Sequence, residues 1–446
     1  MKIKRLNIFI VTILIACLSE QVVSAPLRIV ITKGVEDALP IAVVPFAVEG
    51  AKQPPDDIAA IVSADLARTG RFDPMEPKDM LAKPSRPDAI KYQNWRLMQR
   101  DALVIGNIKS EAAGRYSISF WLFDVYKEAQ LAAFTITGTE SNFRAAAHKI
   151  SDIIYEKLTG QPGAFSTQIA YITASQDKKD KLQKDYSLWI ADADGENPQV
   201  LLKSKEPIYS PSWSPDGKKI AYVSHERGKQ QRIVIQDWSS GARNVVTVPL
   251  KGRQSSPAWS PDGKKLAFTN HKDGNAEIYV LDLSSKKVQR ITNHWAIETE
   301  AVWTPDSETI IFTSDRGGRP QLYKVSANGG AVSRLTFDGI ENARAAVSPD
   351  GKMIAMVTGI RNDATNRLEY RIAVMELATG YLNVLTDGPL DESPSFAPNG
   401  SMIIYATTTR NGRGELAAVS VDGSFQQSLA NEDEVREPAW SPFNKK

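Results

Sequence analysis

One short phrase, repeated six times between residues 210 and 444, constrains the fold of this 446-residue chain more than any other feature. Its clearest copy, residues 256–263, reads Ser-Pro-Ala-Trp-Ser-Pro-Asp-Gly. The bulky residues of the six copies are Trp213, Trp259, Trp303, Val347, Phe396 and Trp440, in steps of 46, 44, 44, 49 and 44 residues. A period in the forties with strand-rich units is typical of a β-propeller, so we predict one blade for each copy.

Each unit reads as four strands. In the clearest unit, Pro261, Asp262 and Gly263 form a turn signal, because proline presets φ and glycine adopts the left-handed conformation that closes a hairpin. Around this turn we predict strands over residues 256–260, 266–268, 277–283 and 288–292. Such a blade has two apolar faces and must lie between like neighbours. We therefore expect the tryptophans to pack between blades rather than to stack on a ligand.

The two ends of the repeat region complement each other. Residues 168–203 contain three strand patterns but no tryptophan-containing first strand, and residues 437–441 supply that strand. Pairing the two segments completes a sixth blade and leaves no open edge in the ring. We predict a six-bladed β-propeller over residues 168–446, closed by its C-terminal strand.

Upstream of the repeats the pattern changes to a small α/β domain. Helical periodicity covers residues 56–69 and 142–158, and Gly160 is a suitable C-cap. Strands are predicted at 27–32, 40–46, 102–108, 116–126 and 129–137. The fold class is therefore mixed: an N-terminal α/β domain over 25–160, a linker over 161–167, and the propeller.

The first 24 residues read as an export signal. A basic start, Lys2, Lys4 and Arg5, precedes an apolar run over 8–18 that is too short to span a bilayer. We expect cleavage before Ala25 and a soluble exported protein. The alternative is a lipoprotein signal with acylation of Cys17, the only cysteine of the chain. Cleavage before Ala25 would leave no thiol for a disulfide.

Charge argues against two classes of partner. The predicted signal carries three basic residues and one acidic residue, and its removal brings the 54 basic and 52 acidic side chains to equal numbers. Without a basic excess we expect neither nucleic-acid binding nor insertion into a membrane. We expect a monomer without a cofactor.

Loop lengths indicate where a partner would bind. Turns between the first and second strands and between the third and fourth strands are short and repetitive, whereas the loops on the other face vary, as recognition loops do on a rigid scaffold. The loops between blades converge on the mouth of the central channel. The candidate binding residues there are Tyr209, Arg253, Gln254, Ser255, Trp295, Ile297, Thr299, Asn342, Arg344, Asp391, Glu392, Val435 and Arg436.

Trp295 is the predicted hot spot, because no blade position obviously buries it. The alternative is that its ring folds over the channel as a plug. Arg253 and Arg344 are either partner contacts or solvated charges at the rim. Acidic residues also gather at the same mouth: Glu298, Glu300, Asp391, Glu392, Asp433, Glu434 and Glu437. These acids could hold a hard cation or simply be solvated. We favour solvated acids and expect no metal.

The chain resembles the TolB family of the Tol-Pal cell-envelope system in Gram-negative bacteria. The resemblance rests on the leading residues 28–31, the block Pro-Ile-Ala-Val-Val-Pro-Phe at 40–46, the stretch 313–325, and the order of exported α/β domain and six-unit propeller. Ser307 departs from the family pattern because it replaces the turn glycine. Val347 and Phe396 depart from it because each replaces a tryptophan.

The resemblance implies a periplasmic scaffold that supports outer-membrane integrity and invagination during cell division. It implies binding of the lipoprotein Pal at the propeller, with Arg253 and Thr299 at positions associated with that contact. It also implies binding of the TolA C-terminal domain through the mature N-terminus, and exploitation of the propeller site by bacteriocin peptides. The implied TolA-binding strand consists of Leu27, Arg28, Ile29, Val30, Ile31 and Thr32. From the residues alone, a docked edge strand is the favoured interpretation of this segment, and the family resemblance reverses that preference.

Two alternatives come from other classes: a propeller enzyme and a glycan-binding propeller. A peptidase would need a Gly-x-Ser-x-Gly elbow, which the sequence lacks, and the histidines His225, His271 and His294 belong to different blades. His148, the fourth histidine, is expected on the surface of the second predicted helix. A glycan site would need several exposed aromatic residues at the mouth, where only Trp295 and Tyr209 qualify.

Overall fold

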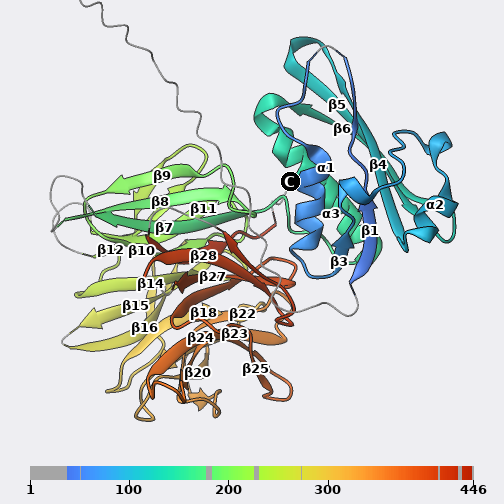
Figure 1. Cartoon of the computed structure of the whole chain (residues 1–446). Helices are drawn as coiled ribbons and strands as arrows, with labels where there is room; N and C mark the ends of the chain where they lie inside the picture. Colours follow the sequence, from blue (N-terminus) through green and yellow to red (C-terminus); the bar gives the residue numbers. More distant parts are fainter. Residues whose placement is uncertain are drawn as a thin grey trace, which may run out of the picture.

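The computed structural model describes residues 38–443, except 51, 177–182, 226–230, 273, 410–411 and 430–433. An α/β domain is seated on one side of a ring of β-sheets (Figure 1). The predicted signal over 1–24 and the predicted strand over 27–32 lie outside the described residues.

The α/β domain is built on one mixed sheet in the order β3-β1-β4-β5-β6, with β2 also pairing with β4. The pairs of β1 with β3 and β4, and of β2 with β4, are parallel, whereas β4, β5 and β6 are antiparallel. The strands are β1 Leu39–Val43, β2 Ala47–Glu49, β3 Phe72–Pro74, β4 Ala102–Ser110, β5 Arg115–Asp124 and β6 Ala129–Thr139.

Two helices cover one face of this sheet, α1 (Ile58–Ala67) and α3 (Phe143–Thr159). Asp57 caps α1 by accepting a hydrogen bond from the amide of Ala60 at 3.1 Å, and Gly160 ends α3 in the left-handed conformation, at φ 73°. The shorter α2 (Tyr92–Leu97) packs on the opposite face through the fully buried Trp95. The described part of the domain also contains four short 3-10 turns: η1 Pro77–Asp79, η2 Pro87–Ala89, η3 Ala112–Gly114 and η4 Glu140–Asn142.

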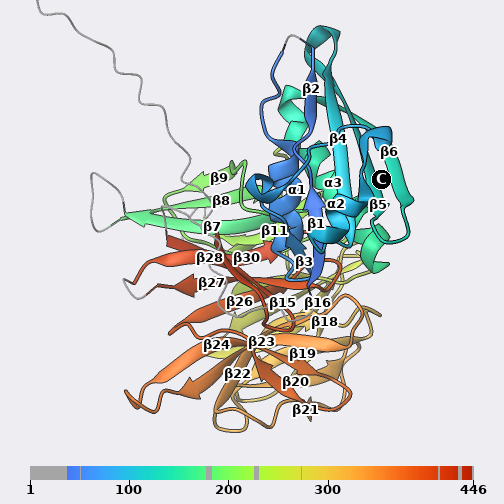
Figure 2. The same ribbon diagram turned by 45° about the vertical axis from the view of Figure 1, so that its right-hand side comes forward.

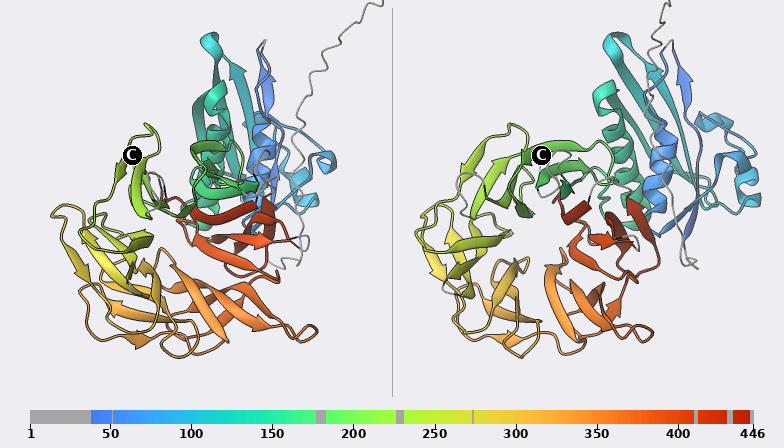
Figure 3. Two further views of the ribbon diagram at one scale, coloured as in Figure 1. Left: turned by 90° about the vertical axis from the view of Figure 1, so that its left-hand side faces the viewer. Right: turned by 60° about the vertical axis from the view of Figure 1, so that its left-hand side comes forward.

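The ring consists of six four-stranded antiparallel blades (Figure 3), as the sequence predicted. From the channel outward, blades 1 to 3 are β10 Ile208–Trp213, β11 Lys219–Ser224, β12 Arg232–Asp237, β13 Arg243–Val245; β14 Arg253–Trp259, β15 Lys265–Lys272, β16 Asn275–Asp282, β17 Val288–Arg290; and β18 Glu298–Trp303, β19 Thr309–Ser314, β20 Gln321–Ser326, β21 Ser333–Arg334.

Blades 4 to 6 follow the same plan. They are β22 Glu341–Val347, β23 Met353–Arg361, β24 Leu368–Glu376, β25 Leu382–Val384; β26 Asp391–Phe396, β27 Met402–Thr408, β28 Gly414–Ser420, β29 Gln426–Leu429; and β30 Glu434–Trp440 with β7 Gln168–Gln176, β8 Lys184–Asp192, β9 Gln199–Ser204. In blade 6, β30 pairs antiparallel with β7, with Val435 opposite Thr173 and Trp440 opposite Ile169. The predicted closure of the ring is confirmed.

The anchors of the repeat pack at the boundaries between blades. The buried Trp303 of blade 3 donates its indole N–H to the carbonyl of Ala258 in blade 2 at 3.1 Å, and Trp213 of blade 1 donates to Ala439 in blade 6 at 3.0 Å. Each indole thus fills the gap between two blades, and its N–H group has a hydrogen-bond acceptor. This confirms the predicted packing role of both tryptophans.

Every inner strand carries a β-bulge at the first residue of the repeated phrase. The bulged residue has a positive φ of 47° to 58° in all six blades: Ser210, Ser256, Glu300, Arg344, Ser393 and Glu437. A bulge re-aims the side chains around it, and these six positions line a central cavity of about 220 Å³.

The α/β domain sits on the face of the short turns, over blades 5 and 6 (Figure 2). Asn399, in the turn between β26 and β27, donates to the carbonyl of Pro162 at 3.0 Å. Gly70 lies so close to Phe425 that a Cβ there would be 3.0 Å from the phenylalanine Cβ, and its φ is +69°. The opposite face, where the inner strands begin, carries the mouth of the channel.

Candidate functional site: the mouth of the propeller

The structure brings the predicted mouth residues to one face, because each lies at the start of an inner strand or in the loop that leads to it. Their accessibility differs. The exposed fraction is 79% for Trp295 and 50% for Ile297, and Arg253 and Arg436 are also exposed. Partly buried are Tyr209, Ser255, Thr299, Arg344 and Glu392.

Four of the predicted binding residues have buried side chains and lie beneath the mouth surface: Gln254, Asn342, Asp391 and Val435. Asn342 donates to the carbonyl of Asp338 at 2.7 Å, and Gln254 donates to the side-chain oxygen of Asn270 at 3.1 Å. These hydrogen bonds connect β22 to the loop that precedes it and β14 to β15. The side chains of these four residues are therefore not accessible to a partner in this arrangement.

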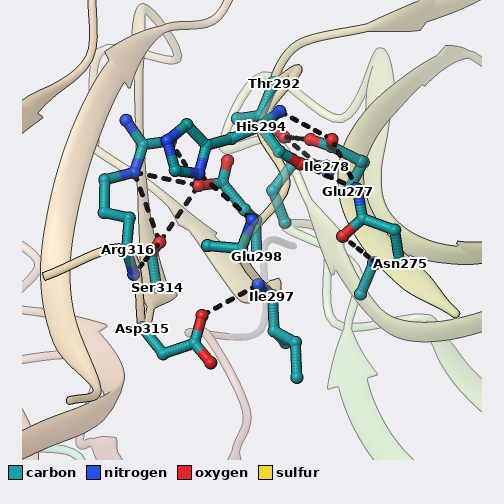
Figure 4. A network of polar contacts seen from close by, with 12 residues as sticks. Asn275, Glu277, Ile278, Thr292, His294, Ile297, Glu298, Ser314, Asp315 and Arg316 are labelled. Atoms are coloured by element: carbon teal, nitrogen blue, oxygen red, sulfur yellow. Dashed lines mark hydrogen bonds and ion pairs between the residues drawn. The ribbon is translucent and has the colours of Figure 1, made fainter. Parts of the chain in front are cut away.

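The loop that carries Trp295 is held by two buried glutamates (Figure 4). On one side, Glu277 accepts hydrogen bonds from the amide of His294 at 2.7 Å and from the hydroxyl of Thr292 at 2.6 Å. Arg290 forms an ion pair with the same carboxylate at 2.7 Å. The backbone on the N-terminal side of Trp295 is therefore fixed by a charged anchor.

On the other side, Glu298 is completely buried and pairs with Arg316, and it also accepts from the hydroxyl of Ser314 at 3.0 Å. The amide of Ile297 donates to Asp315 at 2.9 Å. Trp295 itself lies against the His294 ring, with the ring centres 5.2 Å apart, and projects into solvent. It does not fold into the channel as a plug.

Arg344 lies in the channel wall as one of the six bulged residues. Its guanidinium is 3.1 Å from Glu300, 3.7 Å from Glu437 and 4.0 Å from Glu392. It also donates to the hydroxyl of Ser393 at 2.5 Å. Burial alone would lower the pKa of the guanidinium, but the three carboxylates raise it above its ordinary value. Arg344 is thus a channel residue rather than a solvated rim charge.

Most acids that the sequence gathers at the mouth already have partners. Glu434 pairs with Arg436 and with Lys184, whose amine lies 3.1 Å from it, and Asp391 accepts from the hydroxyl of Thr407 at 2.5 Å. Burial raises the pKa of the Asp391 carboxyl. Asp433 lies outside the described residues. The carboxylates that face the channel are arranged around Arg344, a cation that belongs to the chain itself.

A serine and a histidine meet at the mouth. The Ser255 hydroxyl and the His271 Nε2 are 2.9 Å apart, and burial, followed by the nearby charge of Arg253, lowers the pKa of His271. A nucleophile and base need a third group that orients the base. In the described part of the chain, no carboxylate is hydrogen-bonded to His271. His225 instead contacts the ring of Tyr209, with ring centres 5.6 Å apart.

His148 is buried rather than exposed, which corrects the prediction for it. Its imidazole is 1% exposed and lies between α1 of its own domain and the turn between β8 and β9 of blade 6. The helical pattern places it beside the apolar stripe of α3, but the propeller covers that flank. Only the tertiary arrangement of the two domains reveals this.

The His148 cluster is the one group of side chains, among the described residues, whose geometry suggests a metal. His148 Nδ1 is 2.8 Å from Asp65, and Nε2 is 3.6 Å from Asp194. Both carboxylates already bind the protein's own cations, because Arg68 lies 3.0 Å from Asp65 and Arg144 lies 2.5 Å from Asp194. The cluster is a set of ion pairs between the domains.

Phe337 and Glu277 were missed from the sequence, and Glu298 was expected as a solvated acid at the mouth but is buried. Phe337 is 73% exposed in the loop that joins blade 3 to blade 4, with Arg334 5.2 Å from its ring centre. The rule that selected Trp295, an aromatic residue in a loop between blades, would have selected it too. Glu277 carries no such signal, because a charged residue within a strand usually faces solvent.

The chain is similar to known proteins over nearly its whole length. A family model described as the TolB beta propeller domain matches residues 155–444, and one described as the TolB amino-terminal domain matches residues 27–131. The chain belongs to the TolB family. Relatives with the name Tol-Pal system protein TolB include one from Thioalkalivibrio sulfidiphilus, 51% identical over 433 residues and covering 97% of both chains.

Another TolB relative, from Nitrosococcus oceani, is 52% identical over 431 residues and covers 96% of both chains. The crystal structure of TolB from Acinetobacter baumannii matches with a TM-score of 0.82 at 43% identity, covering 93% of this chain and all of that one. Within the described residues, no helix of this TolB family member has the length and apolar character needed to cross a membrane.

Proposed function

We propose that this TolB family member is a non-enzymatic periplasmic scaffold of the Tol-Pal system. Its propeller mouth binds the lipoprotein Pal, and its mature N-terminal strand binds TolA, so that the protein supports outer-membrane integrity during cell division. Support comes from family membership, since relatives at about half identity are named as Tol-Pal system proteins.

The observation that carries the Pal site is the anchored loop around Trp295. A large aromatic side chain that is 79% exposed, on a loop whose backbone is fixed by Glu277 and Glu298, is ready to bind without first being ordered. Tryptophan is enriched among residues that dominate binding energy. The exposed Ile297 and Phe337 add apolar surface on the same face of the ring.

The proposal for TolA rests on the family resemblance of residues 27–32, which lie outside the described residues. An alternating apolar segment can add as a strand to the sheet edge of another protein. Deletion of residues 25–34 should abolish capture of TolA while capture of Pal is retained. Equal loss of both would indicate misfolding and would contradict this assignment.

The Pal site is tested by capture of purified Pal on the immobilised protein. Trp295→Ala and Arg253→Glu should each weaken capture by about tenfold or more, since truncating a hot spot costs about 2 kcal/mol. The controls are Leu97→Ala in the α/β domain and Lys264→Glu on the short-turn face, where the same kinds of change meet exposed side chains. Melting temperatures should stay unchanged, and normal capture by both mouth variants would exclude this face.

A further inference from the structure

The longest unprotected strand edge of the described structure belongs to β6 of the α/β domain. The outermost strands of blades 1 to 5 are two to four residues long, and β9 of blade 6 has six residues and carries Lys203. The other edge strand of the α/β sheet, β3, has three residues. By contrast, β6 has eleven residues and ends the sheet (Figure 2).

Proteins usually prevent edge strands from pairing with other proteins by means of charged residues, prolines or very short strands. The sequence of β6 is Ala-Gln-Leu-Ala-Ala-Phe-Thr-Ile-Thr-Gly-Thr, without a charged residue or a proline. Its backbone pairs with β5 on one side, and in the described part of the chain no strand pairs with the other side. The single irregularity is a register shift opposite Leu122 and Phe123, near one end.

Apolar side chains accompany this open edge at alternate positions. Ala132, Phe134 and Ile136 lie opposite Leu122, Phe120 and Ile118 of β5, on the face that packs against the helices. Phe134 stacks on the buried Phe120 with ring centres 5.9 Å apart, yet 46% of its side chain is exposed. Ile136 is also only partly covered.

We propose that the outer edge of β6 binds an extended, uncharged segment of another protein, which adds to the sheet as a further strand. Main-chain hydrogen bonds to β6 would provide affinity, and apolar side chains at every second position of the segment would cover Phe134 and Ile136. This surface lies on the α/β domain and is separate from the channel mouth, so the inference does not depend on the proposed Pal site.

The surface fits an extended segment better than a second copy of this chain. Stable protein–protein interfaces bury about 1,200–2,000 Å². One edge strand with two large side chains more than a third exposed, Leu131 and Phe134, offers far less. An extended segment needs less area because its backbone pairs along the whole strand. An uncharged edge also disfavours a charged segment, since a charge next to it would lose hydration without gaining a partner.

The test uses a capped nine-residue peptide of alternating valine and threonine, added to the full chain. Hydrogen exchange of the amides in residues 129–139 should slow when the peptide binds. The same peptide methylated on alternate backbone nitrogens should bind at least about tenfold more weakly, because it lacks the donors that pair with the edge. Equal binding of both peptides, or no protection of β6, would overturn the proposal.

Two variants locate the site on β6. Phe134→Lys and Thr137→Lys both place a charge on the edge strand, and both should weaken peptide binding by about tenfold or more. Thr137 is exposed, so its replacement leaves the core intact even if Phe134→Lys perturbs folding. Leu97→Lys, at a 73% exposed position of α2, is the matched control and should bind normally.

Sedimentation velocity tests whether a second copy of this chain occupies the β6 edge instead. A concentration-dependent dimer that Thr137→Lys abolishes would show that a second copy takes the edge, and the proposal would fail. Pal capture by Thr137→Lys should remain normal. Failure of the β6 proposal therefore leaves the mouth proposal standing, and failure of Pal capture leaves this one standing.

Discussion

Single residues at the blade boundaries decide how well the ring is packed. Trp303 is 6% exposed and hydrogen-bonded to the next blade, whereas Trp259 is only partly buried and its indole N–H has no partner in the described structure. Trp303→Ala should lower the free energy of unfolding by about 3–5 kcal/mol, as for other buried large-to-small changes. Trp259→Ala should cost clearly less.

Denaturant unfolding of the full chain, followed by circular dichroism, measures both tryptophan variants. Trp303→Phe separates the two contributions of the indole: it keeps most of the volume and removes the hydrogen bond, worth about 1 kcal/mol. Equal losses for Trp303→Ala and Trp259→Ala would mean that all anchors pack alike, against the burial described above.

Arg344 balances the acids of the channel. Burial raises the pKa of Glu437, and Arg344 opposes that shift. Arg344→Met should lower the free energy of unfolding by about 2 kcal/mol at pH 7, because carboxylates remain crowded without their cation. A carboxyl whose pKa is raised on folding destabilises the fold above its unfolded pKa, so this variant should regain stability as the pH falls from 7 toward 5.

Thermal unfolding at pH 5, 6 and 7 checks the Arg344→Met prediction. Arg253→Met is the control, since it removes an exposed arginine from the same face and should change stability by less than about 0.5 kcal/mol. A loss for Arg344→Met that does not change with pH would assign the effect to packing instead of charge.

At the scale of elements, the repeat predicts the blades well but not the orientation of their inner side chains. Proline, aspartate and glycine mark each turn, and the spacing of the tryptophans counts the blades. A regular strand alternates its faces at every residue. The bulge at residues such as Ser256 and Arg344 resets that alternation, and positive φ at a non-glycine residue has no sequence signal. Gln254 and Asn342 were therefore expected at the surface but are buried.

The short elements of the α/β domain escaped prediction for a different reason. Strand β3 has three residues, and α2 has six, so neither is long enough to show a period. Residues 40–46, expected as one strand, contain β1 and the break before β2. The position of β6 at the end of the sheet could not be read either, because strand order is a tertiary property.

The closing strand β30 can be tested as an element. Deletion of residues 434–446 removes the partner of β7 and opens a nine-residue strand, so the variant should aggregate and lose its cooperative unfolding transition. A synthetic peptide with the sequence of residues 434–443 should restore solubility by pairing with β7. A soluble, cooperative deletion variant would show that blade 6 is stable with three strands.

At the scale of the whole molecule, the His148 cluster makes the contact between the domains depend on pH. His148 faces Asp65 of α1 and Arg68 at the C-cap of that helix, Arg144 of α3, and Asp192 and Asp194 of the propeller. Burial alone would lower its pKa, but Asp65 and Asp194 raise it above the ordinary value. The protonated imidazole thus bridges carboxylates of both domains.

A raised histidine pKa stabilises the folded state below the unfolded pKa of about 6.5, and this stabilisation is lost as the pH rises through the folded pKa. The melting temperature should therefore fall as the pH rises above about 6.5. In His148→Gln this dependence should flatten. Titration of the His148 ring by NMR should give a pKa above 6.5, and a lower value would contradict the bridging role.

Ring closure also makes folding of the propeller depend on its last strand. The side chain of Ser441 accepts a hydrogen bond from the amide of Gln168, across 273 positions of sequence. Strand β30 is the last propeller strand in the sequence, so β7 keeps a bare edge until residues 434–440 pair with it. A prematurely terminated chain keeps that edge and remains a target for chaperones and proteases. The ring therefore closes only in a chain that extends through β30.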